Sequence, residues 1–253
     1  MPTEKLHDAI GAIHVRFGGQ ALVQATRLPH ARPWPTGQPA VDRLSGIGGL
    51  PRGRLSVLRG ALGSGKLSLA LALLARATRE HARAVVIDGR DGGFDPWIPD
   101  RLGADVDALT VVRPSNPAVA GEAAVALARA GAGFGLVLEE LPEPALAPLA
   151  SAAARSGCLV LVIAGGERRA LAHASSLTLE LERVGWVRER GRDVGARSRL
   201  RCVKNKLAAP GAEAELELRY PLGPRLPAAE APREVAREVE AEPWHEAEAS
   251  AAG

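Results

Sequence analysis

The chain is poor in aromatic residues and has only two cysteines. Phe, Trp and Tyr make up 3% of its 253 residues, whereas apolar residues make up 46%, so a sizeable core must be built mainly from Ala, Leu and Val. Cys158 and Cys202 form no CxxC pair, and the six histidines show no ligand spacing. The sequence therefore predicts no metal site, and both cysteines are expected to be reduced, buried thiols.

Long apolar runs are also lacking. No stretch of eighteen apolar residues is present, which excludes a membrane-spanning helix on sequence grounds. The first ten residues carry acidic side chains and no apolar segment, so no signal peptide is expected. These features predict a cytoplasmic protein that does not contact a membrane.

Charge is unevenly distributed along the chain. From Arg225 onward there are three Arg and seven Glu, so this segment carries −4, whereas the preceding part has 29 basic and 22 acidic residues and carries +7. A basic body with an acidic tail is typical of proteins that bind nucleic acid or an acidic partner. Ordinary solubility is the alternative explanation.

The N-terminal part reads as an arm on a tether. Residues 4–17 are expected to form a helix, Ala21–Gln24 a short strand and residues 27–40 a Pro-rich linker, which sets residues 1–26 apart as the arm. Helical spacing places four side chains on one apolar stripe, which we interpret as an interface for a partner or a second copy: Leu6, Ile10, Ile13 and Phe17.

Residues 41–224 show the pattern of an α/β core. Short apolar strands alternate with helices, which predicts a mostly parallel sheet covered on both faces, followed by antiparallel strands separated by Gly-containing turns. Residues 225–253 are rich in Ala, Glu and Pro and are expected to be disordered. The expected strands are Leu55–Leu58, Ala84–Ile87, Leu109–Val112, Leu136–Leu138, Leu159–Ile163, Leu177–Leu181, Gly185–Arg190, Arg197–Val203 and Glu213–Arg219.

A phosphate-binding loop follows the first of these strands. Residues 60–66 fit the spacing GxxxxGK, in which glycines admit phosphate to backbone amides, the helix N-terminus adds positive potential and Lys66 adds a charge. The Ser or Thr that normally follows the lysine and ligates magnesium is replaced by Leu67. Ser68 is one position further on and is rotated about 100° around the helix.

The motifs around this loop resemble those of the RecA family. The resemblance rests on Pro35-Thr36-Gly37, on Gly48 to Arg54, on Val86-Ile87-Asp88, on Phe94-Asp95-Pro96, on Arg101 to Asp105 and on Val203 to Pro210, and it covers roughly residues 4–222. It implies a RecA-like P-loop core that binds ATP. The residues implied for nucleotide binding are Gly60, Gly63, Ser64, Gly65, Lys66, Ser68 and Asp95, the last at the adenine. Trp97 is read either as a stacking partner for the base or as plain packing.

Several positions depart from the family pattern. Arg90 stands where a Glu would polarise the attacking water, although Asp91 is adjacent. The Walker B strand ends in Glu139-Glu140 rather than Asp, and Gly165-Gly166 replaces a polar pair that senses the γ-phosphate. These losses predict a degenerate ATPase that binds ATP without efficient hydrolysis, and hence a protein that is not an enzyme.

Within this superfamily, the chain is similar to the ImuA family. That resemblance implies an accessory role in the DNA-damage response and mutagenic translesion synthesis, with RecA and an ImuB-like polymerase-family protein as partners. An active DNA-dependent ATPase or recombinase and a SulA-like inhibitor of cell division are the alternatives. Lys204 and Lys206 match a segment that closes the neighbouring ATP site in RecA filaments, and we interpret them as partner contacts.

An arginine stripe is the last feature of the core. Arg197, Arg199 and Arg201 alternate with Ser198, Leu200 and Cys202, so strand geometry places them on one face, and Arg188 and Arg190 are expected on the partner strand with Arg192. The stripe predicts weak contact with DNA or with an acidic protein; a solvated sheet face is the alternative. In the tail, Trp244 stands among glutamates, where it is a docking motif or has no role.

Overall fold

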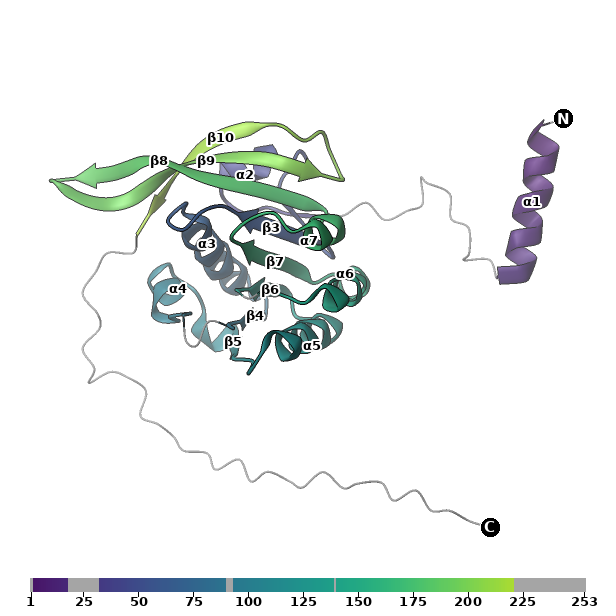
Figure 1. The fold of residues 1–253 in the computed structure, drawn as a ribbon, viewed down its shortest axis with the longest axis horizontal. Helices are drawn as coiled ribbons and strands as arrows, with labels where there is room; N and C mark the ends of the chain where they lie inside the picture. The colour runs from purple at the N-terminus through teal and green to yellow at the C-terminus, as the bar shows by residue number, and fades with distance from the viewer. Residues whose placement is uncertain (1, 18–31, 90–92, 139, 221–253) are drawn as a thin grey trace, which may run out of the picture. The chain divides into compact units, whose positions relative to one another are not determined.

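The computed structural model describes residues 2–17, 32–89, 93–138 and 140–220 (Figure 1). Its helices are α1 (Pro2–Phe17), α2 (Pro39–Leu44), α3 (Lys66–Arg79), α4 (Trp97–Arg101), α5 (Pro117–Arg129), α6 (Glu143–Ser156) and α7 (Arg169–Ala174), with a 3-10 turn η2 at Val106–Ala108. Its strands are β1 (Pro33–Trp34), β2 (Leu50–Pro51), β3 (Leu55–Arg59), β4 (Ala84–Ile87), β5 (Leu109–Val112), β6 (Phe134–Val137), β7 (Leu159–Ala164), β8 (Leu177–Glu189), β9 (Arg192–Asn205) and β10 (Glu213–Arg219).

An eight-stranded sheet forms the centre, in the order β10-β9-β8-β3-β7-β6-β4-β5. The strands from β8 to β5 in this order pair in parallel, and β8, β9 and β10 pair antiparallel. The predicted fold class, a mostly parallel sheet extended by antiparallel C-terminal strands, is therefore confirmed. Parallel strands need crossover helices, which is why strand and helix alternate up to β8.

Two apolar layers cover the faces of this sheet. On one face α2 and α3 bury side chains such as Val41, Leu69 and Leu73 against Leu58 and Leu136. On the other face α5, α6 and α7 bury side chains against alternate positions of the same strands. Figure 1 shows α3 and α4 on one side of the strands and α5 and α6 on the other. Both faces of the central strands are thus dry, as their unbroken apolar sequences predict.

The two strands expected at 177–181 and 185–190 form one strand, β8. Its register with β9 shifts between Arg183 and Gly185 and again between Val187 and Arg188. Such irregularities let a strand bend and continue instead of ending. The result is a long β8–β9 hairpin that extends beyond the ends of the parallel strands (Figure 1).

The segment expected to be a linker is partly folded. Trp34 pairs with Leu50 in the two-stranded sheet β1–β2 and is 3% exposed. Its ring meets Phe134 edge-on with 5.7 Å between centroids, and its Nε1 donates to Glu80 Oε2 at 2.8 Å. A buried indole needs a partner for its N–H, and a position 46 residues away provides it. Trp34 therefore belongs to the core, although it lies within residues 27–40, the expected linker.

Helix α1 forms as expected over Pro2–Phe17, and Ile10 and Ile13 are each 36% exposed. The side chains of Leu6 and Phe17, the expected strand Ala21–Gln24, and the tail from 225 with Trp244 lie outside the described residues. Within the described part of the chain, no helix is both long enough and apolar enough to cross a membrane.

Candidate nucleotide-binding site

The predicted phosphate loop connects β3 to the N-terminus of α3. Gly60, Gly63 and Gly65 have positive φ values of 152°, 76° and 90°. Residues other than glycine rarely adopt such backbone conformations. Gly65 is the N-cap of α3 and has no capping side chain, so the first amides of the helix point out of its end. This combination is the local structure that an anion-binding loop requires.

Lys66 lies across the loop that precedes it. Its Nζ donates to the carbonyl oxygens of Gly60 at 2.8 Å and Ala61 at 2.9 Å, and the residue is 7% exposed. The amine is therefore held at the mouth of the loop, where an incoming phosphate exchanges carbonyl contacts for contacts with an anion.

Ser64 provides a direct test of whether the loop fits phosphate. The residue is 2% exposed, and its Oγ has no hydrogen-bond partner among the described residues. A Cβ added at Gly60 would lie 2.7 Å from this oxygen. A buried hydroxyl without a partner is costly, and a phosphate oxygen would satisfy it. The residues present thus fit a nucleotide phosphate.

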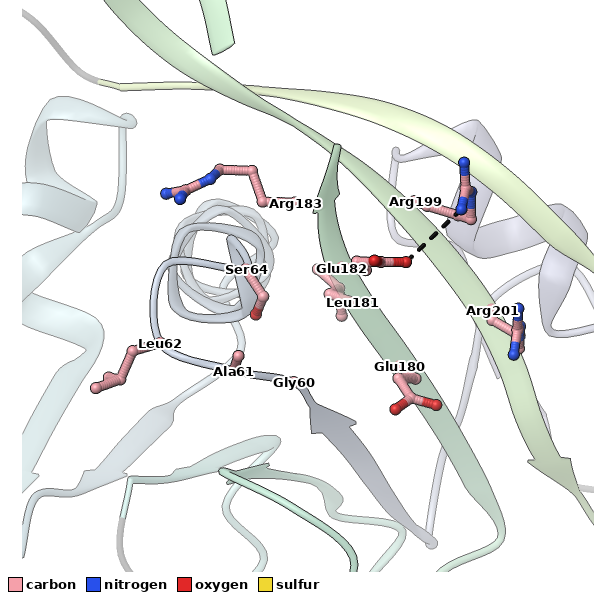
Figure 2. Close-up of a pocket in the computed structure, with 10 residues that line it drawn as sticks. All are labelled: Gly60, Ala61, Leu62, Ser64, Glu180, Leu181, Glu182, Arg183, Arg199 and Arg201. Atoms are coloured by element: carbon pink, nitrogen blue, oxygen red, sulfur yellow. Dashed lines mark ion pairs between the residues drawn. The ribbon is translucent and has the colours of Figure 1, made fainter. Parts of the chain in front are cut away.

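A cavity of about 430 Å³ opens beside the loop. This is within the size range of small-molecule sites. Figure 2 shows the loop on one side and β8 and β9 on the other, with Arg183 extending from β8 on the side of the loop and Glu182 facing Arg199. The lining residues are Gly60, Ala61, Leu62, Ser64, Glu180, Leu181, Glu182, Arg183, Arg199 and Arg201.

Ser68 and Asp95, also predicted to bind nucleotide, do not line this cavity. Ser68 is half-buried in the first turn of α3, one position after the exposed Leu67. Asp95 accepts a hydrogen bond from the backbone of Trp97 at 3.0 Å and so orders the start of α4. Trp97 itself is 45% exposed, which does not fit the interpretation of this side chain as plain packing.

A buried carboxylate that the sequence analysis did not include in the site lies at the end of β4. Asp88 is 1% exposed, accepts a hydrogen bond from the backbone of Phe94 at 3.1 Å, and lies 3.8 Å from Arg113. Its signal was available, because a polar residue at the carboxyl end of a buried parallel strand points to a site. Glu140 is exposed, while Glu139, Arg90 and Asp91 lie outside the described residues.

The arginine stripe has the predicted geometry, but acidic neighbours neutralise its positive charge. Ser198, Leu200 and Cys202 are fully buried, and the arginines between them face outward. However, Arg197 pairs with Glu217 at 2.9 Å, Arg199 with Glu182 at 3.6 Å and Arg201 with Glu213 at 2.6 Å. Arg188 pairs with Asp193 at 2.8 Å, Arg190 lies in the β8–β9 turn, and Arg192 begins β9. The face is a ladder of opposite charges rather than a basic strip.

Lys204 and Lys206, predicted to contact a neighbouring protomer, both reach the end of α7. Lys204 Nζ donates to the carbonyl oxygens of Ala172 and Ser175, and Lys206 Nζ donates to that of His173 at 2.8 Å. Cations at a helix C-terminus satisfy its unpaired carbonyls. Burial lowers the pKa of Lys204, and the nearby Lys206 lowers it further.

The fold and the loop define a P-loop α/β protein with a RecA-like core. The family model described as the RecA N-terminal domain matches residues 4–152. The chain is 32% identical to protein RecA of Aquifex pyrophilus over 85% of this chain and 73% of the relative, and 31% identical to protein RecA of Thermus thermophilus over 86% and 76%. A crystal structure of the RadB recombinase has the same fold, with 17% identity, a TM-score of 0.57, and coverage of 72% of this chain and 94% of that one. The chain belongs to the RecA family.

These comparisons correct one expectation. The departures at Leu67, Arg90 and Gly165-Gly166 led us to expect a degenerate ATPase that is not an enzyme, and this is wrong. The similarity to RecA proteins extends over most of the chain at 31–32% identity, so the chain belongs to a family of ATP-hydrolysing recombinases. Single-position departures were weighted too heavily against a similarity that extends over most of the chain.

Proposed function

We propose that this chain binds and hydrolyses ATP at residues 60–66 and acts in DNA repair. The observation that carries this proposal is the glycine loop at the N-terminus of α3. Lys66 lies across its mouth, and the buried hydroxyl of Ser64 has no hydrogen-bond partner in the described part of the chain. Loop amides, Ser64 and Lys66 would hold the phosphates, and Asp95 would contact the adenine. Ser68, Glu139 and Glu140 are the proposed oxygen ligands of the magnesium that accompanies ATP, which would neutralise phosphate charge.

ATP turnover by the purified full chain, with and without single-stranded DNA, tests the proposal. We expect hydrolysis that Lys66→Ala abolishes. Arg155→Ala, which changes an exposed arginine of α6 that donates a hydrogen bond to Ser151, should leave it unchanged. Turnover that persists in Lys66→Ala would point to a contaminating ATPase. No turnover in the unmodified chain would refute hydrolysis.

For the biological role, we propose an ImuA-like accessory function in translesion synthesis, with RecA and an ImuB-like polymerase as partners. What supports it is the short connection between β7 and β8, residues 165–176, which contains only α7, at a place where the resemblance to RecA implies a DNA-binding loop. An independent recombinase is the second candidate, favoured by the RecA relatives. Purified RecA and an ImuB-like protein should bind the chain in a binary assay. DNA strand exchange by the chain alone would favour the recombinase.

We propose that α1 provides one partner contact through Leu6, Ile10, Ile13 and Phe17. Ile10 and Ile13 are exposed on a helix of sixteen residues. A large apolar side chain in such a stripe is the type of residue that anchors an interface, and removing an anchor residue costs about 2 kcal/mol or more of binding free energy. Phe17→Ala should weaken association with RecA, an ImuB-like protein or a second copy, and leave the unfolding temperature unchanged. Lys204 and Lys206 can contribute to such an interface only by leaving the carbonyls of α7.

Direct DNA contact is proposed to be weak. Arg188, Arg197, Arg199 and Arg201 each have an acidic partner, so binding to phosphate must compete with an existing ion pair. Arg190, in the β8–β9 turn, is proposed to be the strongest contributor. Because few cations are available, the affinity for single-stranded DNA should depend weakly on salt. We place the protein in the cytoplasm, where its two free thiols remain reduced.

A further inference from the structure

Arg183 differs from the other cations of the cavity beside the phosphate loop. Arg199 and Arg201 each have a carboxylate partner, and Glu180 pairs with Arg59 at 3.1 Å. No carboxylate among the described residues lies within ion-pair distance of Arg183. Its positive charge is therefore the one in this cavity that acidic side chains of the described chain leave uncompensated.

The guanidinium of Arg183 instead has two neutral neighbours. Nη1 lies 3.5 Å from the carbonyl oxygen of Gly63, at the outer limit of a hydrogen bond, and Cζ lies 4.2 Å from the centre of the Trp186 ring. Figure 2 shows the side chain extending from β8 toward the loop, on the side of Ser64 and away from Glu182. A long contact with a neutral carbonyl is easily exchanged for a stronger one.

The contact with the loop is close. A Cβ added at Gly63 would lie 2.9 Å from Nη1, so the absence of a side chain at Gly63 is what allows the guanidinium to approach. Gly63 is part of the loop that we propose to surround the nucleotide phosphates. The planar guanidinium presents several donors and matches phosphate oxygens better than a carbonyl.

We propose that Arg183 binds the phosphates of the nucleotide in the loop, as a phosphate-contacting residue contributed by β8 of the same chain. This rests on the proposed ATP binding. When a nucleotide is bound, the guanidinium exchanges the Gly63 carbonyl for phosphate oxygens, and its contact with Trp186 changes. Trp186 lies on the same strand and is 41% exposed, so nucleotide binding in the loop changes the surroundings of a side chain in the β8–β9 hairpin.

Isothermal titration calorimetry with a non-hydrolysable ATP analogue and magnesium tests the contact. Arg183→Gln keeps a donor near Gly63 but removes the charge, and should weaken affinity about tenfold, as expected when a hydrogen bond to a charged group is lost. Arg183→Lys keeps the charge and should retain part of the affinity. The control Arg219→Ala removes an ion-paired arginine of β10 outside the cavity, and should change affinity by less than about twofold.

Tryptophan emission supplies an independent readout. Adding the analogue should change the emission of the full chain, and the Trp186 contribution, measured as the difference from Trp186→Phe, should disappear in Arg183→Gln. Equal affinity in Arg183→Gln and the unmodified chain overturns the inference and leaves the proposed function standing. Absence of binding by the unmodified chain overturns both. A lower unfolding temperature in Arg183→Gln with unchanged affinity identifies Arg183 as a structural latch, which also refutes phosphate contact.

Discussion

The hydroxyl of Ser198 in β9 donates a hydrogen bond to the backbone oxygen of Ser64 in the phosphate loop, at 2.9 Å and 134 positions away in the sequence. Both residues are buried. The loop also touches β8 and β10 closely, because a Cβ at Gly60 would lie 2.3 Å from Leu181 O and one at Gly65 would lie 2.6 Å from Leu218 Cδ1. The antiparallel strands therefore form one wall of the proposed nucleotide site.

Ser198→Ala should destabilise the protein by about 1–3 kcal/mol, because the buried carbonyl of Ser64 loses its side-chain donor. Urea denaturation measures this change, and Ser115→Ala on the surface is the matched control. The variant should also bind nucleotide more weakly, since Ser64 is then less well positioned. A stability equal to that of the control would show that the hydrogen bond contributes nothing.

Trp34→Ala should cost about 3–5 kcal/mol of unfolding free energy, the usual cost of removing a large buried aromatic side chain. Trp34→Phe keeps ring packing near Phe134 but loses the donor to Glu80, and should cost less. Chemical denaturation of both variants separates the packing from the hydrogen bond. If residues 33–40 were only a tether, both changes would be nearly neutral.

The pKa of Lys204 lies below its ordinary value of 10.5, mainly because burial disfavours the charge and secondly because Lys206 is close. In the window between this lowered pKa and 10.5 the unfolded state binds more protons than the folded state, so stability should rise with pH there. Lys206→Gln removes the repulsion and should raise the pKa of Lys204. Nuclear magnetic resonance titration of the lysine side chains measures this. An unchanged pKa in Lys206→Gln would show that burial alone lowers it.

Neither cysteine should react with a thiol reagent at pH 8 while the chain is folded. Burial raises the pKa of Cys158 to about 11 and also raises that of Cys202, so the reactive thiolate is scarce as well as inaccessible. Once guanidinium unfolds the protein, both thiols should react with the reagent within the time needed to mix the sample. Rapid reaction of one equivalent in the folded state would contradict the burial of these side chains.

The local elements were predictable from sequence because their signals are local. Leu159–Ala164 is apolar throughout and forms a strand buried on both faces, as expected for Leu159–Ile163. The alternation of Arg197, Arg199 and Arg201 correctly placed them on one face. The short helices α2, α4 and α7 were missed, because six residues or fewer give too little periodicity.

The sequence by itself determined the phosphate loop, the alternation of strand and helix, and the membership of the RecA family, since each is read from short stretches of consecutive residues. Only the tertiary structure decided the partners of charged and aromatic side chains. Lys204 caps α7, Arg199 meets Glu182 and Arg183 reaches Gly63, and each of these contacts joins positions that are distant in sequence. Charge is visible in a sequence, but its neutralisation depends on which strands become neighbours, and only the folded sheet determines that.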